Sequence, residues 1–354
     1  MSTLLSPLHL RSLTLKNRVV MSPMCQYSAQ HGLPNAWHTT HYGSRAQGGA
    51  GLIMLESTAI SPQGRISQSC LGLWNEEQTK AHASLVEHIH NLGSAAGVQL
   101  NHAGRKGSHA VPWQGNAPIS IKDGGWIREA PSAIGTHQET CPIKELSLQD
   151  IQTVIANFKQ AAINAIAAGF DVIELHAAHG YLLHQFLSPL VNQRTDHYGG
   201  DLTNRTRLLT EIVETVRSVM PSGMPLLVRL SCVDSKEKAE GWTLDESVAL
   251  ATRLQKLGVD LLDCTSGGIS APPAQRIGAF NADLAQTIRT ATGIPTGTVG
   301  GIDSAQIAES VLTNDTCDLV FVGRALLRNP YWLLHETAHQ NSRIIPSQYL
   351  RAGF

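Results

Sequence analysis

The sequence lacks the spacings and charge patterns that mark several large classes of protein. Its six cysteines stand far apart with no CxxC pair, which excludes zinc-ribbon and iron–sulfur spacings and suits free thiols in a reducing compartment. No run of about 18 uncharged apolar residues occurs, and the first residues show no basic segment followed by an apolar one. A formal net charge of -1 provides no basic field for nucleic acid or an anionic membrane. We therefore expect a cytoplasmic protein whose partner is a small molecule.

Short apolar or β-branched runs recur along the 354 residues, and each is followed by a helical pattern. Strands that alternate with helices imply right-handed βαβ units and a parallel sheet. Eight such units in a chain of this length favour an α/β fold of the (β/α)8 TIM-barrel type over a doubly wound sheet, with one domain spanning residues 1–354. The predicted strands lie within residues 17–24, 51–58, 95–102, 171–179, 225–231, 260–267, 294–301 and 318–326.

Two segments fall outside this alternation. Residues 104–147 form a long stretch that contains Gly, Pro and Trp and shows no periodicity, so we expect an excursion after the third strand. Residues 8–16 alternate around a turn, which predicts a short N-terminal hairpin that closes the bottom of the barrel.

The residues that end the predicted strands are the candidates for function, because the chemistry of such barrels lies at the C-terminal ends of the strands. Two glycine-bearing ends on the last two strands form a backbone-amide cradle that is typical of phosphate sites, with Arg324 as an added partner for an anion. The alternative is that these glycines only serve tight turns. The strand-end residues are Ser22, Pro23, Met24, Cys25, Gln26, Tyr27, Ala59, Gln99, His102, Arg229, Gly300, Gly301, Gly323 and Arg324.

The end of the fourth strand carries His176, His179 and Tyr181 in an otherwise apolar stretch. A single histidine near a core strand is more often structural. Three neutral donors together could donate hydrogen bonds to a carbonyl oxygen and supply a proton. A metal site is the alternative. Glu174 would share a face with His176 only in a strictly extended strand, and no other carboxylate nearby completes a ligand set.

Two other functions stay open at this point. The letters HETAH match the HExxH pattern of zinc hydrolases, in which His335 and His339 would bind the metal and Glu336 would act as the base. This match follows the last strand and has no evident third ligand, so we expect a solvated helix face. A barrel that binds a phosphorylated ligand without redox activity is the second alternative, and the acid-equipped end of the fourth strand argues against it.

Several long motifs are spread along the chain: LKNRVVMSPMCQYS, SPQGR, QLNHAGRK, GFDVIELHAAHGYLLHQFLSPLVNQRTDHYGGDLTNRTR, LVRLS and FVGRALLRNP. From about Leu4 to the C-terminus, the chain with these motifs resembles the old yellow enzymes, a family of flavin-dependent ene-reductases. The resemblance favours the branch of thermophilic-like ene-reductases and xenobiotic reductase A, and the PWQG, GGW and APSAIG letters of the excursion point to the xenobiotic-reductase side.

The resemblance implies a non-covalent FMN whose phosphate lies at the glycines of the last two strands and at Arg324. Arg229 would sit by the pyrimidine edge, where a fixed cation stabilises the anionic reduced flavin. The residues implied to bind FMN are Ser22, Pro23, Met24, Cys25, Ala59, Gln99, Arg229, Gly300, Gly301, Gly323 and Arg324.

The resemblance also implies an NADPH dehydrogenase that reduces the activated C=C bond of α,β-unsaturated carbonyl compounds, with nitro compounds as further substrates. NADPH or NADH would reduce the flavin, leave, and be replaced by the alkene, which agrees with the absence of a GxGxxG dinucleotide site. His176 and His179 would bind the activating oxygen and Tyr181 would protonate the α-carbon. Cys25 would tune the flavin and contact the substrate, and Tyr27 would line the pocket.

The resemblance finally implies a homodimer or homotetramer, in which a C-terminal arginine reaches the substrate pocket of the neighbouring subunit. The matching residue is Arg351. Ala352 and Gly353 separate it from the final aromatic residue, Phe354, whereas close relatives often place a tryptophan one step nearer. A frayed, solvated tail is therefore the alternative.

Overall fold

The computed structural model describes residues 2–135, 137–235, 241–269, 277–338 and 344–352. Eight parallel strands close into a barrel in the order of the chain, with the last strand paired to the first. This arrangement confirms the predicted (β/α)8 barrel. Each strand falls inside a predicted run except β4, which extends one residue beyond its run to Ala59. The strands are β3 (Val19–Met21), β4 (Leu52–Ala59), β5 (Ala95–Asn101), β8 (Val172–Ala177), β9 (Leu226–Ser231), β10 (Leu261–Thr265), β11 (Thr296–Val299) and β12 (Leu319–Val322).

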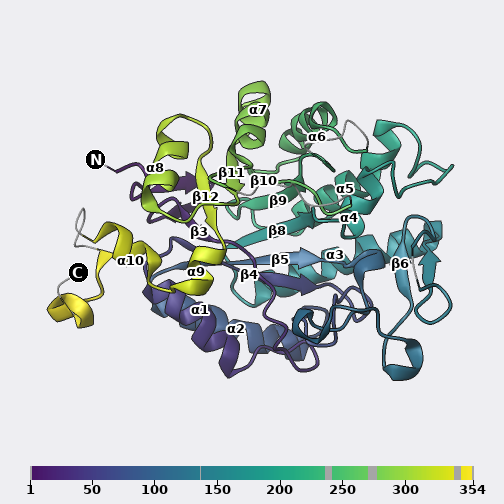
Figure 1. Cartoon of the computed structure of the whole chain (residues 1–354), viewed down its shortest axis with the longest axis horizontal. Coiled ribbons are helices and arrows are strands. Elements are labelled where there is room, and N and C mark those ends of the chain that lie inside the picture. The colour runs from purple at the N-terminus through teal and green to yellow at the C-terminus, as the bar shows by residue number, and fades with distance from the viewer. Residues whose placement is uncertain (1, 136, 236–240, 270–276, 339–343, 353–354) are drawn as a thin grey trace.

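Helices surround the barrel (Figure 1). Most of them begin at a side chain that accepts a hydrogen bond from a backbone N–H of the first turn, which stabilises an otherwise unpaired donor. These N-cap residues are Asn35, Asn75, Ser147, Asp201, Thr243 and Ser304. The longer helices are α1 (Ala36–Gln47), α2 (Glu76–Asn91), α3 (Leu148–Ala167), α5 (Leu202–Arg217), α6 (Leu244–Lys256), α7 (Ala282–Thr292) and α8 (Ala305–Thr313), and the shorter ones are α4 (Leu182–Leu187), α9 (Arg324–Arg328) and α10 (Trp332–Thr337).

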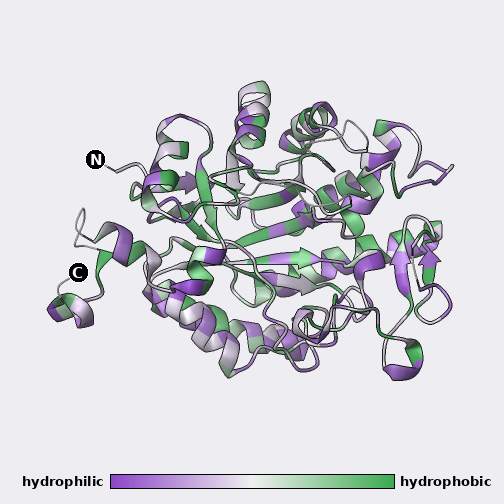
Figure 2. Cartoon of the chain, viewed as in Figure 1, coloured by the Kyte–Doolittle hydropathy of each residue, from purple (hydrophilic) through white to green (hydrophobic). Residues whose placement is uncertain are grey.

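The strands carry the core of the molecule. Figure 2 shows them mostly hydrophobic, in contrast to the mixed colouring of the surrounding helices. Continuous apolar runs are what strands covered on both faces require, because the barrel interior and the helix layer both exclude water from them. None of the described helices is long and apolar enough to cross a bilayer.

The predicted hairpin is present at the N-terminus. Strands β1 (Leu8–Leu10) and β2 (Leu13–Leu15) pair antiparallel, with Leu8 opposite Leu15. Leu10 and Leu15 are buried in one apolar cluster with the inward residues at the starts of the barrel strands, among them Val20 and Leu227. The hairpin therefore closes the N-terminal end of the barrel with side chains, as predicted.

The segment after β5 is the predicted excursion, and it contains one element that the sequence pattern did not indicate. Strands β6 (Arg128–Ala130) and β7 (Ile143–Glu145) form a small parallel pair at the periphery of the barrel (Figure 1). Strands of three residues are too short to show the alternation on which such a prediction depends. The 3-10 turn Gly104–Lys106 connects β5 to this excursion.

Candidate active site

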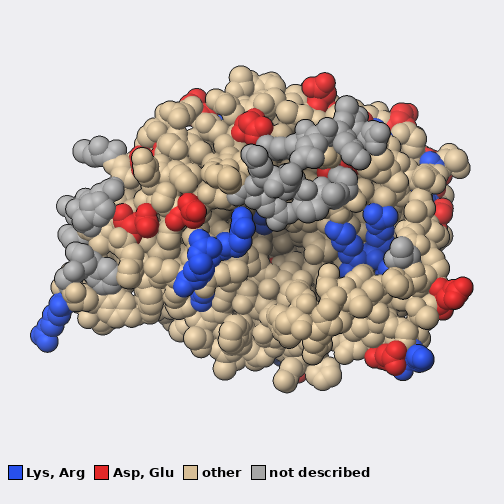
Figure 3. Space-filling model, in the orientation of Figure 1, with Lys and Arg blue, Asp and Glu red and all other residues tan. Residues whose placement is uncertain are grey.

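A cavity of about 500 Å³ opens at the C-terminal ends of the barrel strands. Its size lies in the usual range of small-molecule sites, about 300–1,000 Å³. Figure 3 shows this face of the molecule hollowed at its centre, with Lys and Arg side chains on both sides of the hollow. The predicted site residues that line the cavity are Ser22, Pro23, Met24, His179, Arg229, Gly300, Gly301, Gly323 and Arg324.

The glycines after β11 have the backbone that a phosphate cradle requires. Gly300 and Gly301 have φ angles of 112° and 69°, a region that side-chain-bearing residues avoid. A Cβ on Gly301 would collide with the carbonyl oxygen of Gly278, which also lines the cavity. Arg324 follows Gly323 at the start of α9 and adds a cation to the same wall. Exposed amides, close backbone approach and a guanidinium fit the phosphate of FMN.

The side chains of His176, His179 and Tyr181 meet above the end of β8. The ring centroid of His176 lies 5.2 Å from that of His179 and 5.0 Å from that of Tyr181. A left-handed turn produces this meeting, since His179 and Gly180 have φ angles of 58° and 72°. Side chains that would point apart on an extended strand are thereby brought to one place.

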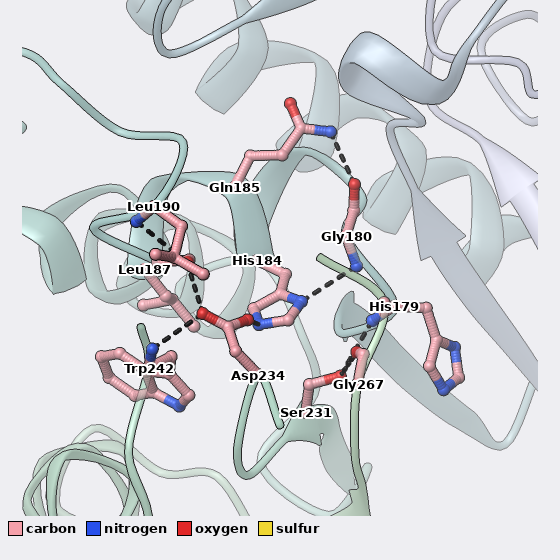
Figure 4. Close-up of polar contacts among 12 residues, drawn as sticks. His179, Gly180, His184, Gln185, Leu187, Leu190, Ser231, Asp234, Trp242 and Gly267 are labelled. Atoms are coloured by element: carbon pink, nitrogen blue, oxygen red, sulfur yellow. Dashed lines mark hydrogen bonds and ion pairs between the residues drawn. The ribbon is translucent and has the colours of Figure 1, made fainter. Parts of the chain in front are cut away.

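A hydrogen-bond network behind this turn holds it in place (Figure 4). The His179 backbone N–H donates to Ser231 Oγ at 2.9 Å, and the Gly180 N–H donates to His184 Nδ1 at 2.9 Å. His184 Nε2 in turn lies 3.0 Å from Asp234 Oδ1, and Gln185 donates to the Gly180 carbonyl at 2.7 Å. These partners come from α4, from the last residue of β9 and from the loop after it, and no motif of the sequence indicated their role.

Burial decides the protonation of the three side chains. It lowers the pKa of His176 and His179 far below the usual value, and the positive charge of Arg229 lowers both further. Both imidazoles are therefore neutral at pH 7, and each keeps one ring N–H that can donate to a carbonyl oxygen. Burial also raises the pKa of Tyr181 well above its usual value, so the phenol keeps its proton. His176 Nδ1 is buried without a hydrogen-bond partner among the described residues.

A layer of charged side chains lies directly below the cavity, inside the barrel. Gln99 Nε2 donates to Glu174 Oε1 at 2.7 Å, and Arg229 Nε lies 3.2 Å from Asp263 Oδ2. Arg229 also donates from Nη1 to Ser22 Oγ at 3.2 Å, which aims its guanidinium at the first strand. Each side chain comes from a different strand, so barrel closure brings them together.

Burial raises the pKa of Glu174 to about 8 and that of Asp263 to about 6. Arg229 opposes both shifts, and the two acids repel one another when ionised. The layer thus holds a proton at neutral pH. The sequence patterns indicated Glu174 only as a possible metal ligand and did not indicate Asp263, although an acid in the middle of an apolar strand was the available signal.

Cys25, Tyr27 and Ala59 are not among the residues that line the cavity, and two of them lie beside Tyr181. Cys25, Tyr27 and Tyr181 pack against one small apolar cluster that includes Cys70, a residue the sequence analysis did not single out. Burial raises the pKa of Cys25 well above its usual value, so its thiol stays protonated. Ala59 ends β4 and is buried.

Two sequence predictions lie away from this cavity. Arg351 is exposed in the 3-10 helix Ser347–Ala352, and Gly353 and Phe354 lie outside the described residues. Glu336 Oε2 accepts the backbone N–H of Ala305 at 2.8 Å, which gives the proposed zinc base a structural role. His339 lies outside the described residues, and the described residues contain no group of three possible metal ligands.

Comparison with known proteins places these features in context. The sequence profile described as "NADH:flavin oxidoreductase / NADH oxidase family" matches residues 3–342. The chain is 43% identical over 358 residues to an NADPH dehydrogenase of Listeria monocytogenes, with 99% of each chain covered, and 41% identical over 351 residues to one of Bacillus subtilis, with 98% of each covered.

Solved structures of similar sequence have the same fold as this chain. Morphinone reductase superposes with a TM-score of 0.79 at 28% identity, over 96% of this chain and 90% of that one. The old yellow enzyme homologue of Zymomonas mobilis gives a TM-score of 0.76 at 27% identity, over 93% and 90% of the two chains. A morphinone reductase in complex with tetrahydroNAD is similar at 29% identity and a TM-score of 0.76, over 94% of this chain and 89% of that one.

Proposed function

The chain belongs to the NADH:flavin oxidoreductase / NADH oxidase family, and from this membership we propose that it is an ene-reductase of the old yellow enzyme type. It is an oxidoreductase that uses FMN, with NADPH or NADH as the reductant. Its proposed substrates are α,β-unsaturated carbonyl compounds, whose C=C bond it reduces, and nitro compounds. The observation that carries the proposal is the meeting of His176, His179 and Tyr181 beside a cavity floored by Arg229.

Residues on the cavity wall fit the parts of FMN. Gly300, Gly301, Gly323 and Arg324 would hold its phosphate, and Arg229 would face the edge of the ring that becomes negative on reduction. Bound FMN supplies the two-electron chemistry, taking hydride from NAD(P)H and giving it to the alkene. The other residues proposed to contact it are Ser22, Pro23, Met24, Cys25, Ala59 and Gln99.

The two neutral imidazoles would bind the oxygen that activates the alkene. N–H donors from His176 and His179 stabilise negative charge on that oxygen while the β-carbon accepts hydride. Tyr181 holds the proton that the α-carbon then takes, so hydride and proton together add one H₂ across the bond. Its raised pKa is no obstacle, because an enolate carbon is a strong base.

The same cavity would serve both half-reactions. Tyr27 and Cys25 would line its substrate side, and the reductant and the alkene would bind there in turn. Neither a zinc hydrolase nor a barrel without redox activity is favoured, since the matching family consists of oxidoreductases.

The test is turnover of a panel that contains 2-cyclohexenone, a maleimide and a nitroalkene with NADPH and with NADH. A yellow protein with a flavin absorption band that oxidises either reductant only when an enone is present supports the proposal. The proposal fails if NADPH reduces the flavin but no enone or nitroalkene reoxidises it faster than oxygen does. The protein would then be an NADPH oxidase.

We also propose a homodimer or homotetramer in which Arg351 reaches the site of the neighbouring subunit, and one FMN-binding domain over residues 1–354. The exposure of Arg351 supports the first point, because an arginine packed within its own subunit could not extend to another. A cytoplasmic location is supported by the six free cysteines.

A further inference from the structure

A second cavity, of about 260 Å³, lies under the excursion and next to the site described above. Its walls contain three cationic side chains and no acidic one, together with His109, whose pKa burial lowers below its usual value; we name this group the basic pocket. Figure 3 shows Lys and Arg gathered to the right of the central hollow, apart from a second group to its left. The pocket is lined by Arg105, Lys106, His109, Arg128, Gly135 and Ile143.

The cations of this pocket are held by carbonyl oxygens. Lys106 Nζ donates to the carbonyls of His179 and Gly268 at 2.7 and 2.6 Å. Arg128, only 3% exposed, donates to the carbonyls of Arg105 and Cys141. Such contacts fix the side chains without neutralising their charge.

No carboxylate within the described ranges forms an ion pair with Arg105 or Lys106. Asp234 is the acid whose negative charge raises the pKa of Arg105. Its carboxylate already accepts a hydrogen bond from Ser188 and pairs with His184. Burial, with a smaller contribution from the neighbouring Arg105, lowers the pKa of Lys106 to about 8. Crowded, half-buried cations of this kind are stabilised when an anion binds among them.

We propose that the basic pocket binds a ribose-bound phosphate monoester, namely the 2′-phosphate of NADPH, and thereby selects NADPH over NADH. The inference rests on the proposed function for the identity of the reductant. The guanidinium fork of Arg105 beside the Lys106 ammonium matches the oxygens of a phosphate dianion better than those of a single carboxylate, and the buried charge of Arg128 lies in the same wall.

The location supports the reductant as the source of this phosphate. Lys106 joins the two cavities, since it touches the His179 carbonyl and lies 5.8 Å from the centre of the Tyr181 ring. A dinucleotide whose nicotinamide occupies the catalytic cavity can therefore extend its other end toward Arg105. The basic wall at Arg324 lies in the other cavity, where the FMN phosphate is expected.

Calorimetric titration of the FMN-loaded protein tests the pocket without turnover. Adenosine 2′,5′-bisphosphate should bind at least about tenfold more tightly than AMP, and Arg105→Gln should abolish that difference. Lys122→Gln, which removes a charge from an exposed part of the same excursion, should preserve it. The proposal is overturned if AMP binds the parent protein as tightly as adenosine 2′,5′-bisphosphate does. It is also overturned if the difference in affinity between the two ligands is unchanged in Arg105→Gln.

Adenosine 3′,5′-bisphosphate separates the two sources of such a phosphate. If it binds more tightly than the 2′,5′ isomer, the pocket serves a coenzyme A thioester and the assignment to the reductant is wrong. In stopped-flow reduction, Arg105→Gln should raise the apparent Kd for NADPH about tenfold while affecting NADH far less. An equal loss of affinity for NADPH and for NADH would also contradict the assignment to the 2′-phosphate. Failure of enone turnover, with these titrations as expected, would refute only the proposed function.

Discussion

The two ends of the barrel are built from the same strands and have opposite chemistry. At the N-terminal end, Leu10 and Leu15 of the hairpin fill the opening against apolar residues such as Val172 of β8. Two and four residues further along β8 stand Glu174 and His176, both buried in the polar end. One strand thus contributes to a sealed apolar plug and to a reactive site.

The closed end of the barrel contributes mainly to stability, and the open end contributes mainly to function. Apolar side chains at the closed end gain free energy on burial at about 25 cal/mol per Å². The buried acids at the open end, and His176 Nδ1, which has no hydrogen-bond partner among the described residues, cost stability because they lose water without full replacement. The polar end is therefore expected to be maintained for its chemistry, and the experiments below test this division.

The largest expected effect is at the open end. Tyr181→Phe should slow flavin reoxidation by 2-cyclohexenone by about 10²-fold or more, since general acid catalysis contributes on that order. Reduction by NADPH should be nearly unaffected, because it needs no proton on carbon. Stopped-flow absorbance separates the two half-reactions. An equal loss in both would remove Tyr181 from the role of acid.

At the closed end, Leu10→Ala should lower the free energy of unfolding by about 2–4 kcal/mol through the cavity it leaves. Rates of both half-reactions and FMN affinity should stay as in the parent, because the hairpin lies at the opposite end of the strands. Urea unfolding measures the loss, with exposed His9→Ala as the control. Release of FMN from folded Leu10→Ala would show that the two ends are coupled.

The oxygen-binding role predicts a smaller effect on affinity. His176→Ala or His179→Ala should weaken binding of p-hydroxybenzaldehyde, a phenol that imitates the enolate oxygen, by about tenfold. Titration of the charge-transfer band measures this. His179→Asn, which retains an N–H donor, should recover part of the loss. An unchanged titration in both alanine variants contradicts the assignment.

The charged layer predicts a pH dependence of stability. The pKa of Glu174 is raised to about 8 in the folded protein from about 4.5 in the unfolded chain. A carboxyl with a raised pKa destabilises the fold as pH rises between these values, because the folded state must give up a proton it holds. Glu174→Gln should therefore gain stability relative to the parent as pH rises from 5 to 9, by on the order of a few kcal/mol. Parallel stability curves would show that Glu174 does not titrate.

The smallest effect concerns the tail. A chain that ends at residue 348 should show a KM for enones raised a few-fold, with FMN still bound, if Arg351 reaches the neighbouring pocket. Sedimentation of the same sample reports the oligomeric state. A monomer with full activity after this truncation would exclude the contact.

Much of the architecture could be predicted from local pattern. Each barrel strand is an apolar run, and each run predicts a strand from its local sequence alone, independently of the other strands. The residues that end the strands could be named for the same reason. The parallel pair β6 and β7 could not, because its three-residue strands carry too little pattern.

The sequence by itself determined the order of strands and helices, the hairpin, and which residues stand at the reactive end, because these depend on short-range periodicity and on strand direction. Only the tertiary structure decided which side chains meet. Glu174 and Asp263 act on one another because barrel closure places their strands around one interior. Arg105 and Arg128 share a pocket because the excursion folds back on itself. Protonation followed from the same closure, since burial and neighbouring charge, neither visible in local sequence, set each pKa.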